Sequence, residues 1–320
     1  MNHLENRRNQ TGVRVGFFVG IVVCLCLLVV AVLRMSAPHD YLSRYSVVVD
    51  ASPVEVWSLD PVAGTMVVLT IPSDTTIETL YGYGMYTLDA LWKLGNIENK
   101  AGTIVADSLS DALGLSIPWY IAPSSQDIQW TSTDNNYGSS LFSYANVTKK
   151  LFGQYRTNMP FGVWMAFVNA VSGARVEQKH VLSFGHDQIA YQEDLPDGST
   201  RFVLDRTRID YYLNSVFTSE AFRKENVSVT LFNTSDVPLI GNRAARFLAN
   251  EGIMVASIGN DPVQTKTCVM RGQTAALASK TAIEVARLFR CTREKISAED
   301  RSDLMVYLGT DFAEKYRTTQ

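Results

Sequence analysis

Residues 227–258 read VSVTLFNTSDVPLIGNRAARFLANEGIMVASI, and this stretch decides the fold of the C-terminal part of the chain. Val227–Phe232 has the spacing of a strand, Leu239–Asn250 the spacing of a helix, and Ile253–Ile258 again that of a strand. Gly252 follows the helix, where a left-handed residue commonly ends it. The stretch therefore predicts a strand–helix–strand unit.

The residues that follow extend this unit into a domain. Thr265–Met270 is a predicted strand, Gln273–Arg290 a long helix with one apolar face, and Leu304–Leu308 a final strand. The order is βαββαβ, the split βαβ plan, in which two helices cover one face of an antiparallel or mixed sheet. We expect this C-terminal domain to span residues 226–312.

The residues upstream predict a second α/β domain over residues 45–222, so the fold class is α/β, of the α+β kind. Short apolar runs bounded by turn residues indicate strands, and apolar positions at helical spacing indicate helices. Residues 123–145 are polar and are expected to form a long loop. The predicted elements are strands Tyr45–Asp50, Val54–Leu59 and Thr65–Ile71, and helices Thr87–Leu94, Ile104–Leu113, 146–172 and Ile209–Phe217.

A long apolar segment precedes both domains. Residues 15–33 read VGFFVGIVVCLCLLVVAVL and contain no charge. A helix rises about 1.5 Å per residue, so this segment is long enough to cross a hydrocarbon core of about 30 Å. We therefore expect a transmembrane helix over 15–33 in a lipid bilayer. The alternatives are a buried core helix and a cleaved signal peptide, whose apolar core is usually shorter.

The charges around this segment indicate its orientation. Arg7, Arg8 and Arg14 precede it, whereas only Arg34 follows closely. Because an excess of Lys and Arg marks the cytoplasmic side, residues 1–14 are expected to be a cytoplasmic tail and the body to lie outside the cytoplasm. The predicted localisation is thus the cell membrane, with a single pass.

Composition and cysteines add two expectations. The net charge is −3, which does not favour a polyanion-binding surface, and a cytoplasmic tail this short is too small to bind DNA specifically. We expect no nucleic-acid partner. Outside the predicted membrane segment the cysteines are Cys268 and Cys291, which an oxidising compartment would allow to form a disulfide. Two buried thiols are the alternative, and no metal site is predicted.

The C-terminal domain resembles the LytR C-terminal domain family. The residues that carry the resemblance are the strand Ser228–Asn233, the segment Val237–Gly241, the helix end Ala249–Gly252 and the terminal Val306–Gly309. The family usually has Asn-Gly-Thr after its first strand, where this chain has Asn233-Thr234-Ser235.

Residues 45–122 resemble, more faintly, the catalytic domain of LytR-CpsA-Psr proteins, through Ile71-Pro72-Ser73-Asp74-Thr75 and Leu113–Ile117. The resemblance implies a membrane-anchored transferase that attaches polyprenyl-pyrophosphate-linked glycopolymers to peptidoglycan. Such enzymes use Arg on the pyrophosphate and Asp with a divalent metal. Here Ser73 stands where the family has Arg, and serine lacks the charged fork that grips phosphate oxygens. This chain also lacks the family's loop of metal-binding carboxylates, because Asp50-Ala51-Ser52-Pro53 leads almost directly into the next predicted strand, so we expect a degenerate domain.

Weak catalytic candidates remain in Asp74, Arg201, Arg206 and Arg208. The arginines belong to a mixed charge run that is either an anion site or a solvated face with local ion pairs. The sequence therefore predicts an envelope protein without a cofactor that binds peptidoglycan, wall glycopolymer or envelope proteins, and leans away from catalysis. The alternative is a working glycopolymer phosphotransferase, in which Asp74 would bind Mg²⁺.

Overall fold

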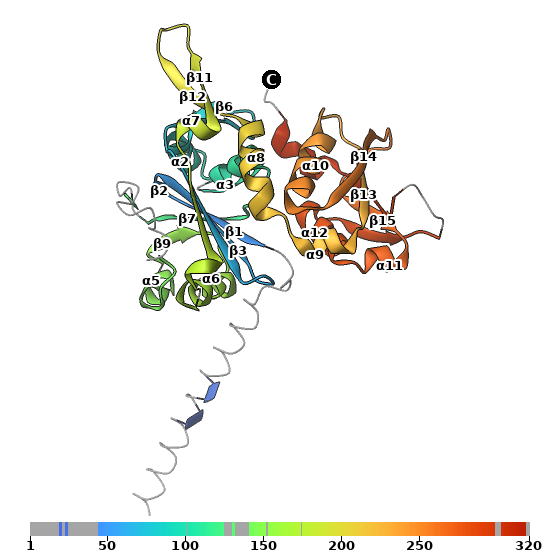
Figure 1. The fold of residues 1–320 in the computed structure, drawn as a ribbon, viewed down its shortest axis with the longest axis horizontal. Coiled ribbons are helices and arrows are strands. Elements are labelled where there is room, and N and C mark those ends of the chain that lie inside the picture. Colours follow the sequence, from blue (N-terminus) through green and yellow to red (C-terminus); the bar gives the residue numbers. More distant parts are fainter. Residues whose placement is uncertain are drawn as a thin grey trace, which may run out of the picture.

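The computed structural model describes residues 19, 20, 23, 24 and 44–317, apart from 101, 125–129, 132–140, 152, 174 and 298–301. Two bodies of mixed α/β structure lie side by side, which confirms the predicted fold class (Figure 1). Within the described ranges no helix is long and apolar enough to cross a membrane. The predicted tail 1–14 and, except for four residues, the predicted membrane helix 15–33 lie outside those ranges.

The N-terminal body is built on a six-stranded mixed sheet with the order β10-β4-β3-β1-β7-β9. Strand β1 lies inside the sheet, antiparallel to β3 and parallel to β7, and all five of its residues are buried. Burial on both faces explains its continuous apolar sequence, YSVVV. The strands are β1 (Tyr45–Val49), β3 (Val54–Asp60), β4 (Thr65–Ile71), β7 (Trp119–Pro123), β9 (Tyr155–Thr157) and β10 (Lys179–Ser183).

Helices cover both faces of this sheet (Figure 1). Because successive side chains of a strand point to opposite faces, Val48 packs in one core and Val47 and Val49 in the other. The first core lies under α2 (Leu88–Ile97), α3 (Thr103–Leu113) and α8 (Arg206–Phe217), and the second contacts α5 (Val147–Leu151) and α6 (Phe161–Gly173).

Two smaller sheets complete this body. A four-stranded sheet has the order β11-β12-β5-β6, and its β11–β12 hairpin projects from the body in Figure 1. Its strands are β5 (Thr75–Thr79), β6 (Gly84–Thr87), β11 (Ala190–Asp194) and β12 (Thr200–Leu204). Strands β2 (Ala51–Ser52) and β8 (Trp130–Thr131) pair with each other, and the short helices are η1 (Tyr144–Asn146), η2 (Val176–Gln178) and α7 (His186–Ile189).

The C-terminal body is a five-stranded sheet with the order β14-β13-β17-β15-β16. Leu231 of the sheet shares one core with Leu248 and Val285 of its two main helices, so both helices lie on the same face. The elements are α9 (Glu220–Glu225), β13 (Ser228–Asn233), α10 (Ile240–Glu251), β14 (Met254–Asn260), β15 (Val269–Gly272), α11 (Thr274–Leu277), α12 (Lys280–Phe289), β16 (Thr292–Lys295), β17 (Leu304–Leu308), α13 (Thr310–Ala313) and η3 (Glu314–Tyr316).

Two predicted helices are wrong as single elements. The helix expected over 146–172 is divided into α5, strand β9 and α6, because Gly153 takes a left-handed φ of +68° and the chain then pairs with β7. The helix expected over Gln273–Arg290 is interrupted at Ser279, whose hydroxyl accepts a hydrogen bond from Ala282 N and so begins α12. Strand β16 was not predicted at all.

Candidate functional site at the domain junction

Helix α3 carries Asp111 at the junction of the two bodies. The Asp111 side chain is only 4% exposed, and its Oδ2 lies 2.8 Å from Nη2 of Arg206 and 2.5 Å from Nη1 of Arg243. Arg206 begins α8 and Arg243 lies on α10, so one buried carboxylate joins both bodies. Glu78 of β5 adds a second, more exposed carboxylate, 3.0 Å from Arg206 and 3.7 Å from Arg243.

Side chains of helix α10 also donate hydrogen bonds to the carbonyl groups at the C-terminal end of α3. Arg246 donates hydrogen bonds to the carbonyl oxygens of Asp111 (2.6 Å) and Ala112 (2.9 Å), and pairs with both carboxylate oxygens of Asp210 at 2.7 Å. Asn250 donates to the carbonyl oxygen of Gly114 at 3.1 Å. The last carbonyls of a helix have no partner within it, so these donors fix the C-terminal body against α3.

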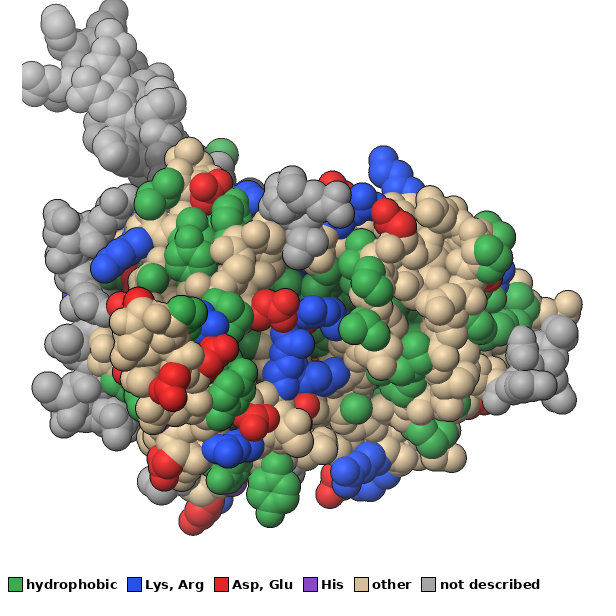
Figure 2. Space-filling model, turned by 90° about the horizontal axis from the view of Figure 1, so that it is seen from above, with side chains coloured by type: hydrophobic (Ala, Val, Ile, Leu, Met, Phe, Trp, Pro, Cys, Tyr) green, Lys and Arg blue, Asp and Glu red, His purple; other side chains and the backbone are tan. Residues whose placement is uncertain are grey.

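Charged side chains of both signs gather at this junction. Figure 2 shows Lys and Arg side chains at the centre of the face, between the two bodies, with Asp and Glu beside them. Three arginines, Arg206, Arg243 and Arg246, are paired there with three carboxylates, so the positive and negative charges nearly cancel. The junction therefore favours a ligand held by local polar contacts over one attracted by a large net charge.

A cavity of about 470 Å³ opens at the same junction and is called the interdomain cavity below. Its size falls in the range of small-molecule sites. One wall comes from the segment before β6, α3 and residues 116–118, and the other from α10, α12, α13 and η3. Its lining combines aromatic rings with charges of both signs, among them Tyr81, Asp107, Phe247, Arg290, Phe312 and Lys315.

Lys315 is the most distinctive group in this cavity. Its Nζ lies over the rings of Phe312 and Tyr316, at 5.2 and 5.4 Å from their centroids, and 4.0 Å from Oδ1 of Asp107. The ammonium donates no hydrogen bond to any residue that the structure describes, while Asp107 accepts one from the Tyr81 hydroxyl at 2.6 Å. Burial lowers the pKa of Lys315, and the neighbouring Asp107 opposes that shift.

A second group of polar residues lies where β1, β2 and β4 end. The Ser73 hydroxyl donates to the Ser52 hydroxyl at 3.1 Å, and Asp74 Oδ1 lies 3.0 Å from His186 Nε2, off the line of a hydrogen bond. Burial raises the pKa of Asp50 to about 6, and Arg156 opposes the shift. Among the residues that the structure describes, no group of three or more His, Cys, Asp or Glu side chains could hold a metal ion.

The arginines of the charge run are not gathered into one site. Arg201 of β12 pairs with Glu193 of the neighbouring β11 at 2.6 Å. Arg208 lies 3.3 Å from Asp205 and donates to the Ala190 carbonyl at 2.8 Å. Only Arg206 reaches the junction between the bodies, whereas Asp74 lies apart, at the end of β4.

Sequence reasoning missed Asp111, Arg243, Arg246 and Lys315. One signal was available: Arg243, Arg246 and Asn250 are separated by three and four residues in a predicted helix, which places them on one polar stripe. That stripe is the surface that contacts α3. Lys315 has no such signal, because it follows the last predicted strand in a short charged segment.

Another buried charge cluster lies between α10, α12 and the start of β1. Burial and the neighbouring Glu284 raise the pKa of Glu251 to about 8, against the effect of Arg287 and Arg44. Glu284 of α12 pairs with Arg287, 3.0 Å from Nε to Oε1. Arg44 lies 3.3 Å from Asp60 and over the ring of Phe217. The cluster connects Arg44, which directly precedes β1, to the C-terminal domain.

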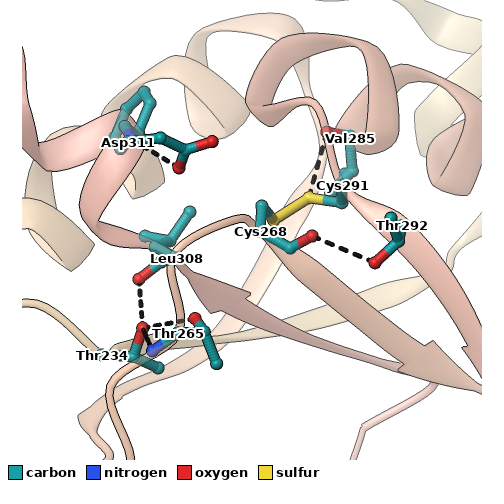
Figure 3. Close-up of a disulfide and its surroundings, with 9 residues drawn as sticks. Thr234, Thr265, Cys268, Val285, Cys291, Thr292, Leu308 and Asp311 are labelled. Atoms are coloured by element: carbon teal, nitrogen blue, oxygen red, sulfur yellow. Dashed lines mark hydrogen bonds between the residues drawn. A yellow bond between two sulfur atoms is a disulfide. The ribbon is translucent and has the colours of Figure 1, made fainter.

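The structure joins Cys268 and Cys291 by a disulfide, which links the segment before β15 to the segment after α12 (Figure 3). Next to it, Thr292 N donates to the Cys268 carbonyl at 2.9 Å, where β16 begins to pair with β15. The disulfide thus fixes the start of the strand that sequence analysis missed.

Residues 226–312 match the family model described as LytR cell envelope-related transcriptional attenuator, which confirms the resemblance of the C-terminal domain. A sequence search of curated proteins finds no match. Similar solved structures include B. subtilis TagV (15% identity, 53% of this chain and 94% of that one, TM-score 0.38). Lin1025 of Listeria innocua is 11% identical over 54% and 96% of the two chains, with a TM-score of 0.38. TagT bound to LIIa-WTA is 9% identical over 55% and 90%, with a TM-score of 0.39.

Proposed function

We propose that the chain is a single-pass membrane protein of the cell envelope that binds a wall glycopolymer outside the cytoplasm and does not transfer it. The apolar segment 15–33 supports the anchor, and the three preceding arginines support a cytoplasmic N-terminus. The match of residues 226–312 to an envelope-related family supports the location of the body.

The observation that carries the binding role is the Lys315 ammonium in the interdomain cavity. A partly buried ammonium that donates to no described residue is suited to an anionic acceptor, such as the phosphate or carboxylate of a glycopolymer. The rings of Phe247 and Phe312 offer apolar contact to sugar faces, and the exposed carboxylates of Asp311 and Glu314 can accept hydrogen bonds from hydroxyls. Both bodies contribute to the cavity, so a ligand there would contact each of them.

The Ser52–Ser73 pair supports a role in binding without transfer. In the resembled family an Arg stands at the position of Ser73, and here a neutral hydroxyl is hydrogen-bonded to a second neutral hydroxyl. Neither group carries the permanent charge that would grip a pyrophosphate. Arg201 and Arg208 are already engaged with Glu193 and Asp205.

A direct binding measurement tests this proposal. The full chain in nanodiscs would be titrated with soluble poly(glycerol phosphate), with neutral dextran as the comparison. Lys315→Met keeps the side-chain length and removes the charge, so we expect affinity to fall roughly tenfold to hundredfold, the equivalent of a charge-assisted hydrogen bond. Lys295→Met, on exposed β16, is the matched control and should bind like the wild type. Unchanged binding by Lys315→Met, or no binding by the wild type, would refute the cavity as the site.

The second candidate function is a phosphotransferase, which the contact between Asp74 and His186 favours. Asp74 would then bind Mg²⁺, while Arg206, the remaining arginine candidate, is paired with Glu78 and Asp111 at the domain junction, apart from Asp74. Incubation of the full chain with Mg²⁺ and a polyprenyl pyrophosphate separates the two functions. Phosphate release that Asp74→Ala abolishes would show that the chain cleaves the pyrophosphate bond, with water in place of the polymer acceptor, and would overturn the non-catalytic proposal.

A further inference from the structure

Strand β14 is an unprotected edge of the C-terminal sheet. It is seven residues long, reads MVASIGN, and pairs with β13 on one side only. It contains neither a charged residue nor a proline, and Met254 and Ile258 are 48% and 43% exposed. Such an edge offers unpaired backbone donors and acceptors to another strand.

The other sheet edges in the described part of the chain differ from β14. Four of them carry charged residues: β16 (TREK), β10 (KHVLS), β9 (YRT) and β11 (AYQED). Strand β6 is uncharged but has only four residues, and β2 and β8 have two each. Charge on an edge strand prevents it from pairing with another chain, and this protection is missing from the longest edge.

Exposed apolar side chains gather at the same place. The large hydrophobic residues that are exposed among the described residues of the C-terminal domain are Leu239, Met254, Ile258 and Val263. Two lie on β14, and Val263 follows it in the next loop. Leu239 directly precedes α10, in whose first turn a Cβ added to Gly241 would come within 2.5 Å of Ile258. A strip of apolar surface therefore accompanies the open edge.

We propose that β14 pairs antiparallel with β14 of a second copy of this chain, which joins the two C-terminal sheets across a two-fold axis. The absence of charge favours this occupant, because a two-fold axis places a strand opposite itself and any charge near the axis would meet its like. Ala256 is the extra residue of a bulge opposite Val229 and Thr230, so Ser257–Gly259 supply the regular pairing across the axis. With the axis at Ile258, its side chain meets its own copy, and Ser257 faces Gly259.

The oligomeric state of the full chain tests the proposal. Sedimentation equilibrium in density-matched detergent should show a reversible dimer for the wild type. Ile258→Lys would place two like charges at the axis, and we expect the dimer dissociation constant to rise roughly tenfold or more. Val181→Lys is the matched control, because Val181 is 42% exposed on an edge strand that already carries Lys179 and His180, and it should leave the dimer unchanged.

Three results would overturn the proposal: a wild type that is monomeric at all concentrations, an Ile258→Lys variant that dimerises like the wild type, or a Val181→Lys variant that loses the dimer equally. The second result would also identify a dimer held by another part of the chain. Thermal unfolding of both variants should match the wild type at concentrations where the wild type is monomeric, since each position is at the surface and dimerisation then adds no stability. The proposal is independent of the glycopolymer site, because β14 does not line the interdomain cavity.

Discussion

Replacement of Asp111 by Asn should loosen the attachment of the C-terminal domain. The substitution keeps the size of the side chain and removes its charge. It leaves Arg243, 23% exposed, and Arg206, 39% exposed, without the buried carboxylate that lies between them. Because the two arginines then face each other across a neutral amide, the interface loses attraction and gains repulsion.

The expected loss in the free energy of unfolding follows from how exposed the two arginine partners of Asp111 are. Removal of one member of a buried ion pair costs about 3–5 kcal/mol, and the pair with Arg243 belongs to this class. The pair with Arg206 is screened by solvent and adds at most about 1 kcal/mol. We expect a loss of about 3 kcal/mol in the free energy of unfolding, because Glu78 remains to neutralise part of the exposed charge.

Chemical denaturation of the full chain in detergent measures this loss, and calorimetry shows whether the two domains now melt separately. Asp236→Asn is the control, because Asp236 also pairs with an arginine, Arg317, at 2.6 Å, but both side chains are about half exposed. That variant should lose less than about 1 kcal/mol. If Asp111→Asn is no less stable than Asp236→Asn, then Asp111 does not hold the domains together and the reasoning fails.

Three further changes test the remaining features. Cys291→Ser opens a loop closed by residues 23 apart, which should cost about 3 kcal/mol in the free energy of unfolding, and dithiothreitol should then lower the melting temperature of the wild type but not of the variant. The folded state keeps a proton on Glu251 up to about pH 8, whereas the unfolded state releases it near pH 4.5, so the free energy of unfolding of the wild type should fall as pH rises between these values. In urea titrations at several pH values, Glu251→Gln should show a flatter dependence of this free energy on pH. The same slope in the variant and the wild type would contradict the raised pKa of Glu251. Gly114→Ala forces a side chain on a φ of +62° and within 2.6 Å of Asn250, so its melting temperature should fall while a Gly198→Ala variant, strained but in open space, falls less.

The sequence predicted elements whose apolar residues are bounded by turns and missed those without an apolar pattern. Strands β3 and β4 were found because a Pro-Gly turn separates two buried runs. Strand β16 was missed because all four of its residues are exposed. Strand β9 was missed because the apolar residues of 146–172 were interpreted as one helix. The site was harder to predict from the sequence, because Arg243 and Arg246 contact partners that lie 132 and 135 residues away in the chain. At such separations the spacing of residues does not indicate which side chains meet.

The position of β1 has a mechanical consequence. The chain enters the body at Arg44 and continues directly into a strand inside the six-stranded sheet, which pairs over five residues with β3 and over three with β7. A pull on the N-terminal side of the chain would therefore load two ladders of hydrogen bonds in shear at once. The pulling force would act first on the contacts of Arg44 with Asp60 and Phe217, and only then on the hydrogen bonds of either ladder. A body attached in this way can resist tension applied to its N-terminal side without peeling open from its first strand.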